Sequence, residues 1–166
     1  MKTRIFLLLA LPLMWTCSES PSTTNEDKNI AIVEKYIQAV ENLDYDNMAS
    51  LLAEDYVGLG PSFNDSISKD QALSSWKNNI EHLYQSIKYN RMQNAGVMIK
   101  DGPNAGEWVS SWAELKINYQ DGNNATIWAN TTYRIVDEKI AKTFTFYNEA
   151  DVLEQLGYVF IHSDKF

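Results

Sequence analysis

Apolar residues in the first half of the chain recur at helical spacing. Val33, Tyr36, Ile37 and Val40 are three or four positions apart, which predicts one apolar helix face between about 29 and 42. A second, short helix is expected to begin at a cap formed by Asp46. A third helix is predicted to begin with a capping box at Ser68 to Gln71 and to carry one apolar face, composed of Leu73, Trp76, Ile80, Leu83 and Tyr84.

From about residue 86 the apolar period changes from that of a helix to two. Five segments rich in β-branched and aromatic residues are expected to be strands: 86–94, 96–100, 107–119, 125–136 and 139–147. The turn sequences between them indicate an antiparallel meander. A last short helix is expected from Ala150 to Leu156, ended by Gly157. Helices followed by an antiparallel meander favour the α+β class.

The two longest predicted strands form a hairpin whose register can be tested. If Asp121 to Asn123 is a three-residue loop, Ile117 faces Ile127 and Leu115 faces Ala129. Odd-numbered positions would then form the apolar face that meets the helices. The following strand can keep this alternation, which turns Thr143 and Thr145 inward. Alternatively, a two-residue turn at 137–138 would turn Phe144 and Phe146 inward, and the sequence does not decide between them.

Three tryptophans lie on the even-numbered, otherwise polar face of the same hairpin: Trp108, Trp112 and Trp128. Aromatic residues on a polar sheet face are typical of a covered surface, so a homodimer through this face is expected. Two alternatives remain open, namely packing of the indoles against local side chains and stacking of a sugar ligand.

The N-terminal segment has the pattern of an export signal. Lys2 and Arg4 precede an eleven-residue apolar run, Ile5 to Trp15, which is too short to span a bilayer. The only cysteine, Cys17, follows directly, in the manner of a bacterial lipoprotein signal, although Trp15 departs from the usual small residues. We expect residues 1–17 to be a signal peptide ending at a lipidation site. An ordinary secretory signal cleaved after Ser18 is the alternative.

The segment 18–28 lacks large apolar residues and is expected to be a flexible linker, with one folded domain at 29–162. The leader places the protein in the bacterial cell envelope, held by a lipid anchor in the periplasm or at the surface; a secreted or soluble periplasmic protein is the alternative. Membrane contact is expected only through that anchor, because the formal charge of −8 opposes adsorption to anionic lipid.

Composition narrows the chemistry further. The 14 basic and 22 acidic residues include no basic stripe, so no nucleic-acid partner is expected. One cysteine and two histidines predict neither an internal disulfide nor a metal site. There is no glycine-rich phosphate loop, and no cofactor is expected.

The order of these elements resembles the nuclear-transport-factor-2-like superfamily, in particular its SnoaL-like and ketosteroid-isomerase-like members. The resemblance rests on two phrases, Leu43 to Val57 and Asp137 to Gly157, and covers nearly all of 29–158. It implies a curved sheet wrapped around N-terminal helices, which forms a cone-shaped barrel with an internal pocket. The superfamily includes isomerases, cyclases, dehydratases and binding domains, so the fold alone does not select an activity.

Most catalytic positions that the resemblance implies are not filled here. Tyr36 matches an oxyanion-hole tyrosine, but Gly60 stands before Pro61 where the isomerases have their general base, and Thr131 stands at the oxyanion aspartate position. The sheet strands contain no histidine, and Arg134 is expected to be a salt-bridged surface residue. An enzyme is therefore not favoured. The alternative is a SnoaL-like isomerase, cyclase or hydrolase of a small cyclic substrate that uses an acid such as Asp55, Asp65 or Glu114.

The pocket implied by the fold would be aromatic and lined by hydroxyl groups. Such a lining suits a small, largely apolar ligand held by contact area and a few hydrogen bonds. The residues expected to line it are Tyr36, Tyr56, Trp76, Tyr84, Thr131, Tyr133, Thr143 and Thr145.

Overall fold

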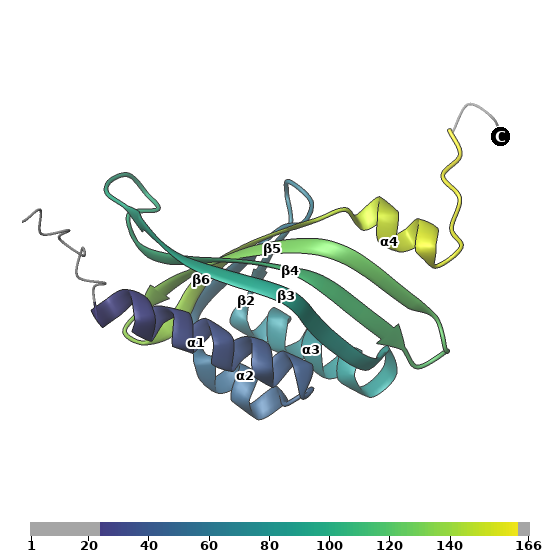
Figure 1. Ribbon diagram of the computed structural model, residues 1–166, viewed down its shortest axis with the longest axis horizontal. Coiled ribbons are helices and arrows are strands. Elements are labelled where there is room, and N and C mark those ends of the chain that lie inside the picture. Colours follow the sequence, from purple (N-terminus) through teal and green to yellow (C-terminus); the bar gives the residue numbers. More distant parts are fainter. Residues whose placement is uncertain (1–23, 163–166) are drawn as a thin grey trace, which may run out of the picture.

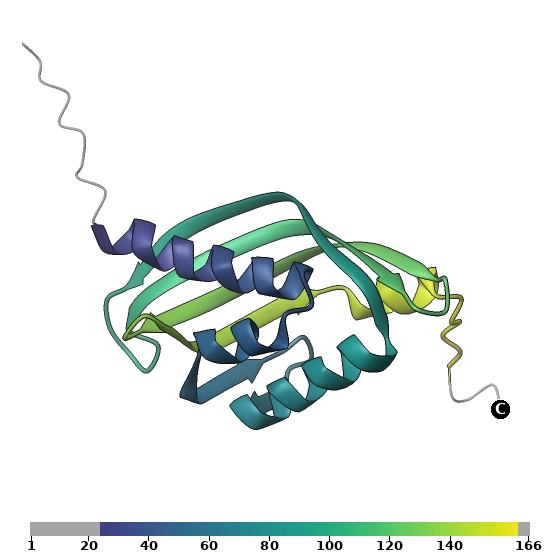
Figure 2. The same ribbon diagram turned by 90° about the horizontal axis from the view of Figure 1, so that it is seen from below.

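The computed structural model describes residues 24–162, which form a curved sheet with three helices against one face (Figure 1). Seen from the helical side, α1, α2 and α3 lie across the concave face of the sheet, and α4 lies at its far end (Figure 2). The helices are α1 (Thr24–Glu41), α2 (Tyr45–Leu51), α3 (Lys69–His82) and α4 (Glu149–Gln155). The strands are β1 (Leu52–Leu59), β2 (Ser66–Ser68), β3 (Tyr84–Ile99), β4 (Gly106–Tyr119), β5 (Asn124–Val136) and β6 (Lys139–Tyr147).

The six strands are ordered β2-β1-β6-β5-β4-β3 in one open sheet. The predicted α+β class and curved sheet around N-terminal helices are confirmed. The sheet is mixed and not wholly antiparallel, because β1 runs parallel to β6 and brings Gly58 beside Thr143. This parallel pair places the end of β1 next to the inward threonines of β6.

The observed start of one helix agrees with its predicted start, and the observed starts of two others differ. The capping box of α3 is confirmed: the Ser68 hydroxyl accepts from Gln71 N–H, and the Gln71 amide oxygen accepts from Ser68 N–H. The cap of α2 is Asp44 and not Asp46, because the Asp44 carboxylate accepts from Asn47 N–H at 3.1 Å while Asp46 lies in the first turn. Helix α1 begins at Thr24, before the expected start at Asn29.

The early start of α1 has a physical reason in its contacts with the edge strand β3. The Glu26 carboxylate accepts from Gly96 N–H at 3.1 Å, and Glu41 accepts from Tyr89 N–H at 2.8 Å. These carboxylates satisfy donors that an edge strand would otherwise leave unpaired. Residues 24–28, expected in the flexible linker, are therefore helical. The predicted signal peptide, Cys17 and residues 18–23 lie outside the described residues.

The hairpin of β4 and β5 has the predicted faces but a different register. Leu115 pairs with Ile127, and Ile117 pairs with Ala125, so each predicted partner is two residues off. The loop consists of Gln120 to Gly122, and Gly122 takes its positive-φ position at φ 90°. Because the shift is even, odd-numbered residues still face the helices. The predicted inward face is confirmed, and the predicted pairing is wrong.

The structure combines the two alternatives considered for β6, namely the two-residue turn of one and the inward threonines of the other. Asp137 and Glu138 form a two-residue turn with positive φ at both positions, so Val136 pairs with Lys139. An irregularity between Arg134 and Ile135 then shifts the register by one residue, which turns Thr143 and Thr145 inward. A β-bulge thus reconciles the short turn with the inward threonines.

The C-terminal helix ends as its glycine predicts. Gly157 has φ 90°, its N–H donates to the Glu154 carbonyl, and Tyr158 N–H donates to the Leu153 carbonyl. This pair of bonds is the Schellman motif. The Gln155 side chain then ties α4 to β5 through both backbone groups of Thr126. Within residues 24–162, no helix combines the length and hydropathy needed to cross a bilayer.

Candidate functional site

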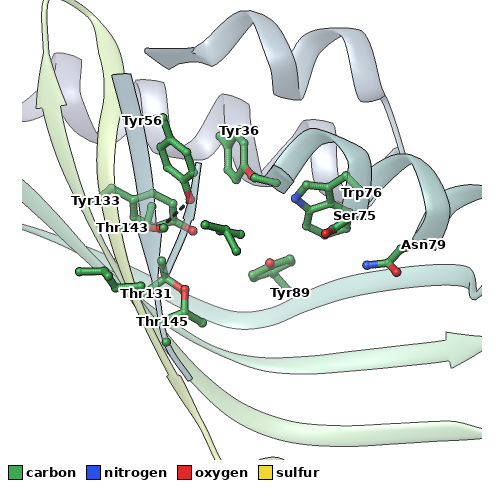
Figure 3. Close-up of a pocket in the computed structure, with 15 residues that line it drawn as sticks. Tyr36, Tyr56, Ser75, Trp76, Asn79, Tyr89, Thr131, Tyr133, Thr143 and Thr145 are labelled. Atoms are coloured by element: carbon green, nitrogen blue, oxygen red, sulfur yellow. Dashed lines mark hydrogen bonds between the residues drawn. The ribbon is translucent and has the colours of Figure 1, made fainter. Parts of the chain in front are cut away.

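A cavity of about 220 Å³ lies between α3 and the inner face of the sheet (Figure 3). Tyr36 reaches it from α1 and Trp76 from α3, while the end of β1 forms one wall. Threonines from β5 and β6 continue this wall alongside β1. An adjoining cavity of about 150 Å³ shares Trp76, Tyr89 and Thr131 with it and continues toward α4.

All but one of the residues expected to line the pocket meet at the larger cavity. The exception is Tyr84, which begins β3 and lines the adjoining cavity, where its ring packs edge-on against Trp76 with centroids 6.3 Å apart. Residues that the sequence did not suggest also line the main cavity: Gly58, Leu59, Gly60, Ile67, Ala72, Ser75, Asn79 and Tyr89.

Hydroxyl groups in the wall are paired with one another. Tyr56 Oη and Thr143 Oγ1 share a hydrogen bond of 2.7 Å, and Thr131 Oγ1 and Thr145 Oγ1 are 3.2 Å apart (Figure 3). The ring of Tyr133 packs edge-on against Tyr36 at 6.2 Å. The threonine wall is therefore held in place by its own hydrogen bonds, although each pair keeps one hydroxyl hydrogen for another acceptor.

Two phenols keep hydrogen-bonding capacity toward the cavity. The indole N–H of Trp76 only donates, so in its interaction with Tyr36 the phenol oxygen accepts and the phenol hydrogen stays available. In the described part of the chain, the Tyr89 hydroxyl has no hydrogen-bond partner. The cavity thus presents at least these two O–H donors to whatever occupies it.

Burial keeps these phenols neutral. It raises the pKa of Tyr36, Tyr89 and Tyr133 well above the usual value, and their closeness to other tyrosines adds to the effect. Burial also raises the pKa of Tyr84 to about 12. No Asp, Glu, His, Lys or Arg is among the described residues that line either cavity. The site offers neutral donors and aromatic surface.

Raising the pH above 10 will destabilise the fold through these tyrosines. An unfolded tyrosine ionises near 10, whereas the folded ones hold their protons to higher pH, so the stabilisation is complete below pH 10 and is lost as pH rises beyond it. The loss is up to about 1.4 kcal/mol per pH unit for each such tyrosine. Phenolate absorbance and circular dichroism should show late tyrosine ionisation coinciding with unfolding. Complete ionisation of the tyrosines near pH 10 with the fold intact would contradict this.

Tyr89 was not predicted to line the pocket, although its segment, 86–94, was predicted to be a strand. β3 is continuous from Tyr84 to Ile99, with an irregularity between Asn90 and Gln93 and positive φ at Arg91. Tyr89 lies before this bulge and two positions after the buried Ile87, so alternation from Ile87 was the signal that could have placed it inward. Ser75 follows Ala72 and Asn79 follows Trp76 by three positions, a helical spacing that a wider search of α3 would have found.

None of the acids considered as catalysts lines the cavity. Asp55 and Asp65 are exposed, and Glu114 lies on the outer sheet face, 3.4 Å from Arg91. Among the described residues, no group of three His, Cys, Asp or Glu side chains could hold a metal. Thr131, at the position of the implied oxyanion aspartate, contributes only its hydroxyl.

The backbone at Gly60 does not accept a side chain as it stands. Its φ is +91°, and a Cβ there would collide with the carbonyl oxygen of Thr145 on the adjacent strand. A carboxylate cannot be introduced at the isomerase base position without moving β1 away from β6. Gly60 therefore serves the close approach of the two strands.

Gly60→Ala will lower the free energy of unfolding by at least about 2 kcal/mol more than Gly102→Ala. Gly102 is the matched control because its φ of +83° is similar but its Cβ would meet nothing within 4 Å. The control isolates the cost of positive φ from that of the collision. Chemical denaturation of both variants measures the difference, and equal costs would refute the collision.

The three tryptophans of the outer face differ in exposure. Trp108 is only 4% exposed, since its own chain covers it: its indole N–H donates to the Asn104 carbonyl and its ring packs on Phe144. Trp128 is 60% exposed and Trp112 38%. Local packing, one of the alternatives, thus describes Trp108. Arg134 also lies on this face but forms no ion pair among the described residues; it donates to the Ala105 carbonyl.

Comparison with known proteins identifies the family. The sequence model of the SnoaL-like domain matches residues 30–145, which run from within α1 to within β6. The chain belongs to the SnoaL-like domain family. Among functionally curated proteins, none matches this SnoaL-like domain significantly in sequence.

Solved structures share the fold at low identity. An LEH-like epoxide hydrolase of Mycobacterium tuberculosis is 14% identical, with a TM-score of 0.58 over 80% of this chain and 91% of its own. A proposed polyketide cyclase of Xanthomonas campestris is 14% identical, with a TM-score of 0.67 over 80% and 99%. A proposed isomerase of Bacillus subtilis is 14% identical, with a TM-score of 0.60 over 82% and 97%. At such identity these three structures support the fold alone.

Proposed function

We propose that this SnoaL-like domain binds a small, largely apolar molecule in the cavity between α3 and the sheet, without catalysing its conversion. The observation that carries the proposal is the lining: aromatic rings and neutral hydroxyls, with no ionisable acid or base among the described lining residues except phenols of raised pKa. A lining of this kind gains affinity from buried apolar area and selects by a few hydrogen bonds.

The ligand that fits best carries one hydrogen-bond acceptor on an apolar body. Tyr36 and Tyr89 each have a phenol hydrogen available, while the threonine wall is already paired. A carbonyl oxygen could accept from these phenols, and its rings or alkyl groups could contact Trp76 and Ile67. Filling the cavity with a purely apolar molecule would leave both donors unsatisfied.

Acetophenone and ethylbenzene test this selection because they differ only in the carbonyl group. Calorimetry should show that acetophenone binds several-fold more tightly than ethylbenzene. Tyr89→Phe should weaken acetophenone binding by roughly fivefold, which is the contribution of one neutral hydrogen bond. Tyr84→Phe is the matched control, since Tyr84 lies outside the main cavity. Equal binding of both compounds, or no binding of either, would overturn the proposal.

The catalytic alternative, an isomerase, cyclase or hydrolase of a small cyclic substrate, would need an acid in the cavity. Asp55, Asp65 and Glu114 would have to move to reach it from their present positions. Steady turnover of a cyclic ketone, lactone or epoxide by the purified protein, lost on replacing one of these acids, would favour this alternative.

We further propose a homodimer through the outer tryptophan patch, which consists of Trp112, Trp128 and Phe146. Trp112 and Phe146 flank Asn130 on either side, Trp128 lies diagonally from both, and each of the three is more than a third exposed. Trp128→Glu should then yield a monomer in sedimentation equilibrium. Thr126→Glu, two residues away on the same face of β5, should leave the dimer intact. A wild-type monomer at micromolar concentration would count against the patch as an interface.

An envelope location is proposed from the leader alone. Lipidation at Cys17 predicts a mature N-terminus with added acyl mass and partition into detergent, both lost on Cys17→Ser. Intact-mass analysis of protein from the native host distinguishes this from cleavage after Ser18, which would leave an unmodified, soluble product.

A further inference from the structure

The turn between β3 and β4 folds over the outer face of the sheet, opposite the helices (Figure 1). Three side chains of the face hold it there. Lys142 Nζ donates to Asn104 Oδ1 at 3.2 Å, and Arg134 Nη2 donates to the Ala105 carbonyl at 2.8 Å. The third bond, from the Trp108 indole to the Asn104 carbonyl, is also 2.8 Å long.

A small hollow of about 110 Å³ lies where this turn meets the sheet. It is separate from the cavity on the helical side, because the sheet stands between them. Its walls are mostly apolar, with one amide and one hydroxyl, and consist of Val97, Ile99, Asn104, Trp108, Thr132 and Phe144. Val97 and Ile99 are still 44% and 36% exposed, so these apolar groups are accessible.

Two positive charges stand beside the hollow without a carboxylate. Lys142 and Arg134 are direct cross-strand partners, and Lys142 Nζ lies 5.7 Å from the centre of the Phe144 ring. Neither forms an ion pair among the described residues, and the enclosed Nε of Arg134 has no acceptor there. Like charges directly opposite each other on a sheet repel.

We propose that the hollow is a second ligand site that binds a small organic carboxylate with a branched aliphatic body. The carboxylate would accept from Lys142, whose present partner is only a neutral amide, and would relieve its repulsion with Arg134. The aliphatic body would contact Val97, Phe144 and the edge of Trp108. The hollow is too small for an extended lipid or a polymer, which favours a short acid.

Isovalerate tests the site, with isovaleramide as its neutral isostere. In a ¹H–¹⁵N spectrum of the mature chain, isovalerate should shift the Trp108 indole and Asn104 side-chain amide signals saturably. The amide should bind at least tenfold more weakly. Lys142→Gln should weaken isovalerate at least tenfold, whereas Lys116→Gln, an exposed lysine on the outer face of β4, should change binding less than twofold. Arg134→Gln gives a second variant should Lys142→Gln disturb the turn.

Three results would overturn the proposal. Equal binding of isovalerate and isovaleramide would remove the role of charge, and unchanged affinity in both variants would place the anion elsewhere. In the third, isovalerate fails to bind and Lys142→Gln turns a wild-type dimer into a monomer. That result would assign the two cations to a carboxylate of a second copy.

Discussion

The Thr145→Trp variant is expected to lose acetophenone binding completely while remaining folded. Thr145 points into both cavities and pairs with Thr131, so an indole at this position would occupy the space that a ligand needs. Loss of the Thr131 partner and tighter packing should cost about 1–3 kcal/mol of stability, a moderate fraction of a typical total. Calorimetric titration measures the loss, and circular dichroism verifies the fold.

Thr126→Trp is the matched control for this variant. Thr126 lies on β5 but on the exposed outer face, so its substitution adds the same indole without entering the cavity. Acetophenone affinity should then equal that of the wild type within about twofold. If Thr145→Trp still binds with wild-type affinity, the ligand site is not the cavity between α3 and the sheet.

Ile140→Ala is expected to give a large loss of stability, about 3 kcal/mol. Ile140 is completely buried, and it pairs with Leu52 across the parallel β1–β6 contact and with Ile135 across the β5–β6 contact. Its side chain therefore joins three strands to the core under α1, and removing it leaves a cavity that neighbours on three sides cannot fill.

The control for Ile140→Ala is Val136→Ala, four residues away on the other arm of the same hairpin. Val136 is 41% exposed, so its truncation should change the free energy of unfolding by less than about 0.5 kcal/mol. Urea denaturation of the two variants measures both values. Comparable losses would mean that the β5–β6 turn, and not burial, determines the cost.

Local patterns were sufficient for most of the elements. The Ser68 capping box, the five predicted strand segments and the glycine end of α4 depend on neighbours in sequence. All are present, and the five segments form β3 to β6. The odd-numbered inward face was predictable because an error of two residues in register preserves the side-chain alternation.

Long-range contacts account for what could not be predicted. The start of α1 depends on Glu26 reaching Gly96, which is 70 residues away in sequence. The alternation of β6 depends on an irregularity between Arg134 and Ile135 that no turn rule reveals. The first feature is set by a segment far away in sequence and the second by a bulge in strand pairing, and composition and periodicity encode neither.

The cavity residues were predictable because their positions follow from the faces of elements. Tyr36 and Trp76 lie on helix stripes, and Thr131 and Tyr133 lie on the inward face of β5. Tyr84 was misplaced because α3 ends at His82, so the helical spacing used for it no longer applies at the first residue of β3. The outer hollow was not predictable, because it needs the β3–β4 turn to fold over the sheet.

The central claim, that the cavity holds a small acceptor-bearing ligand, is tested most directly by a ¹H–¹⁵N titration of the wild-type chain with acetophenone. The account predicts saturable shifts concentrated at Tyr89, Thr131 and Thr143, with ethylbenzene several-fold weaker. Shifts confined to the outer face, or no saturable shift at any concentration that acetophenone reaches in water, would contradict it.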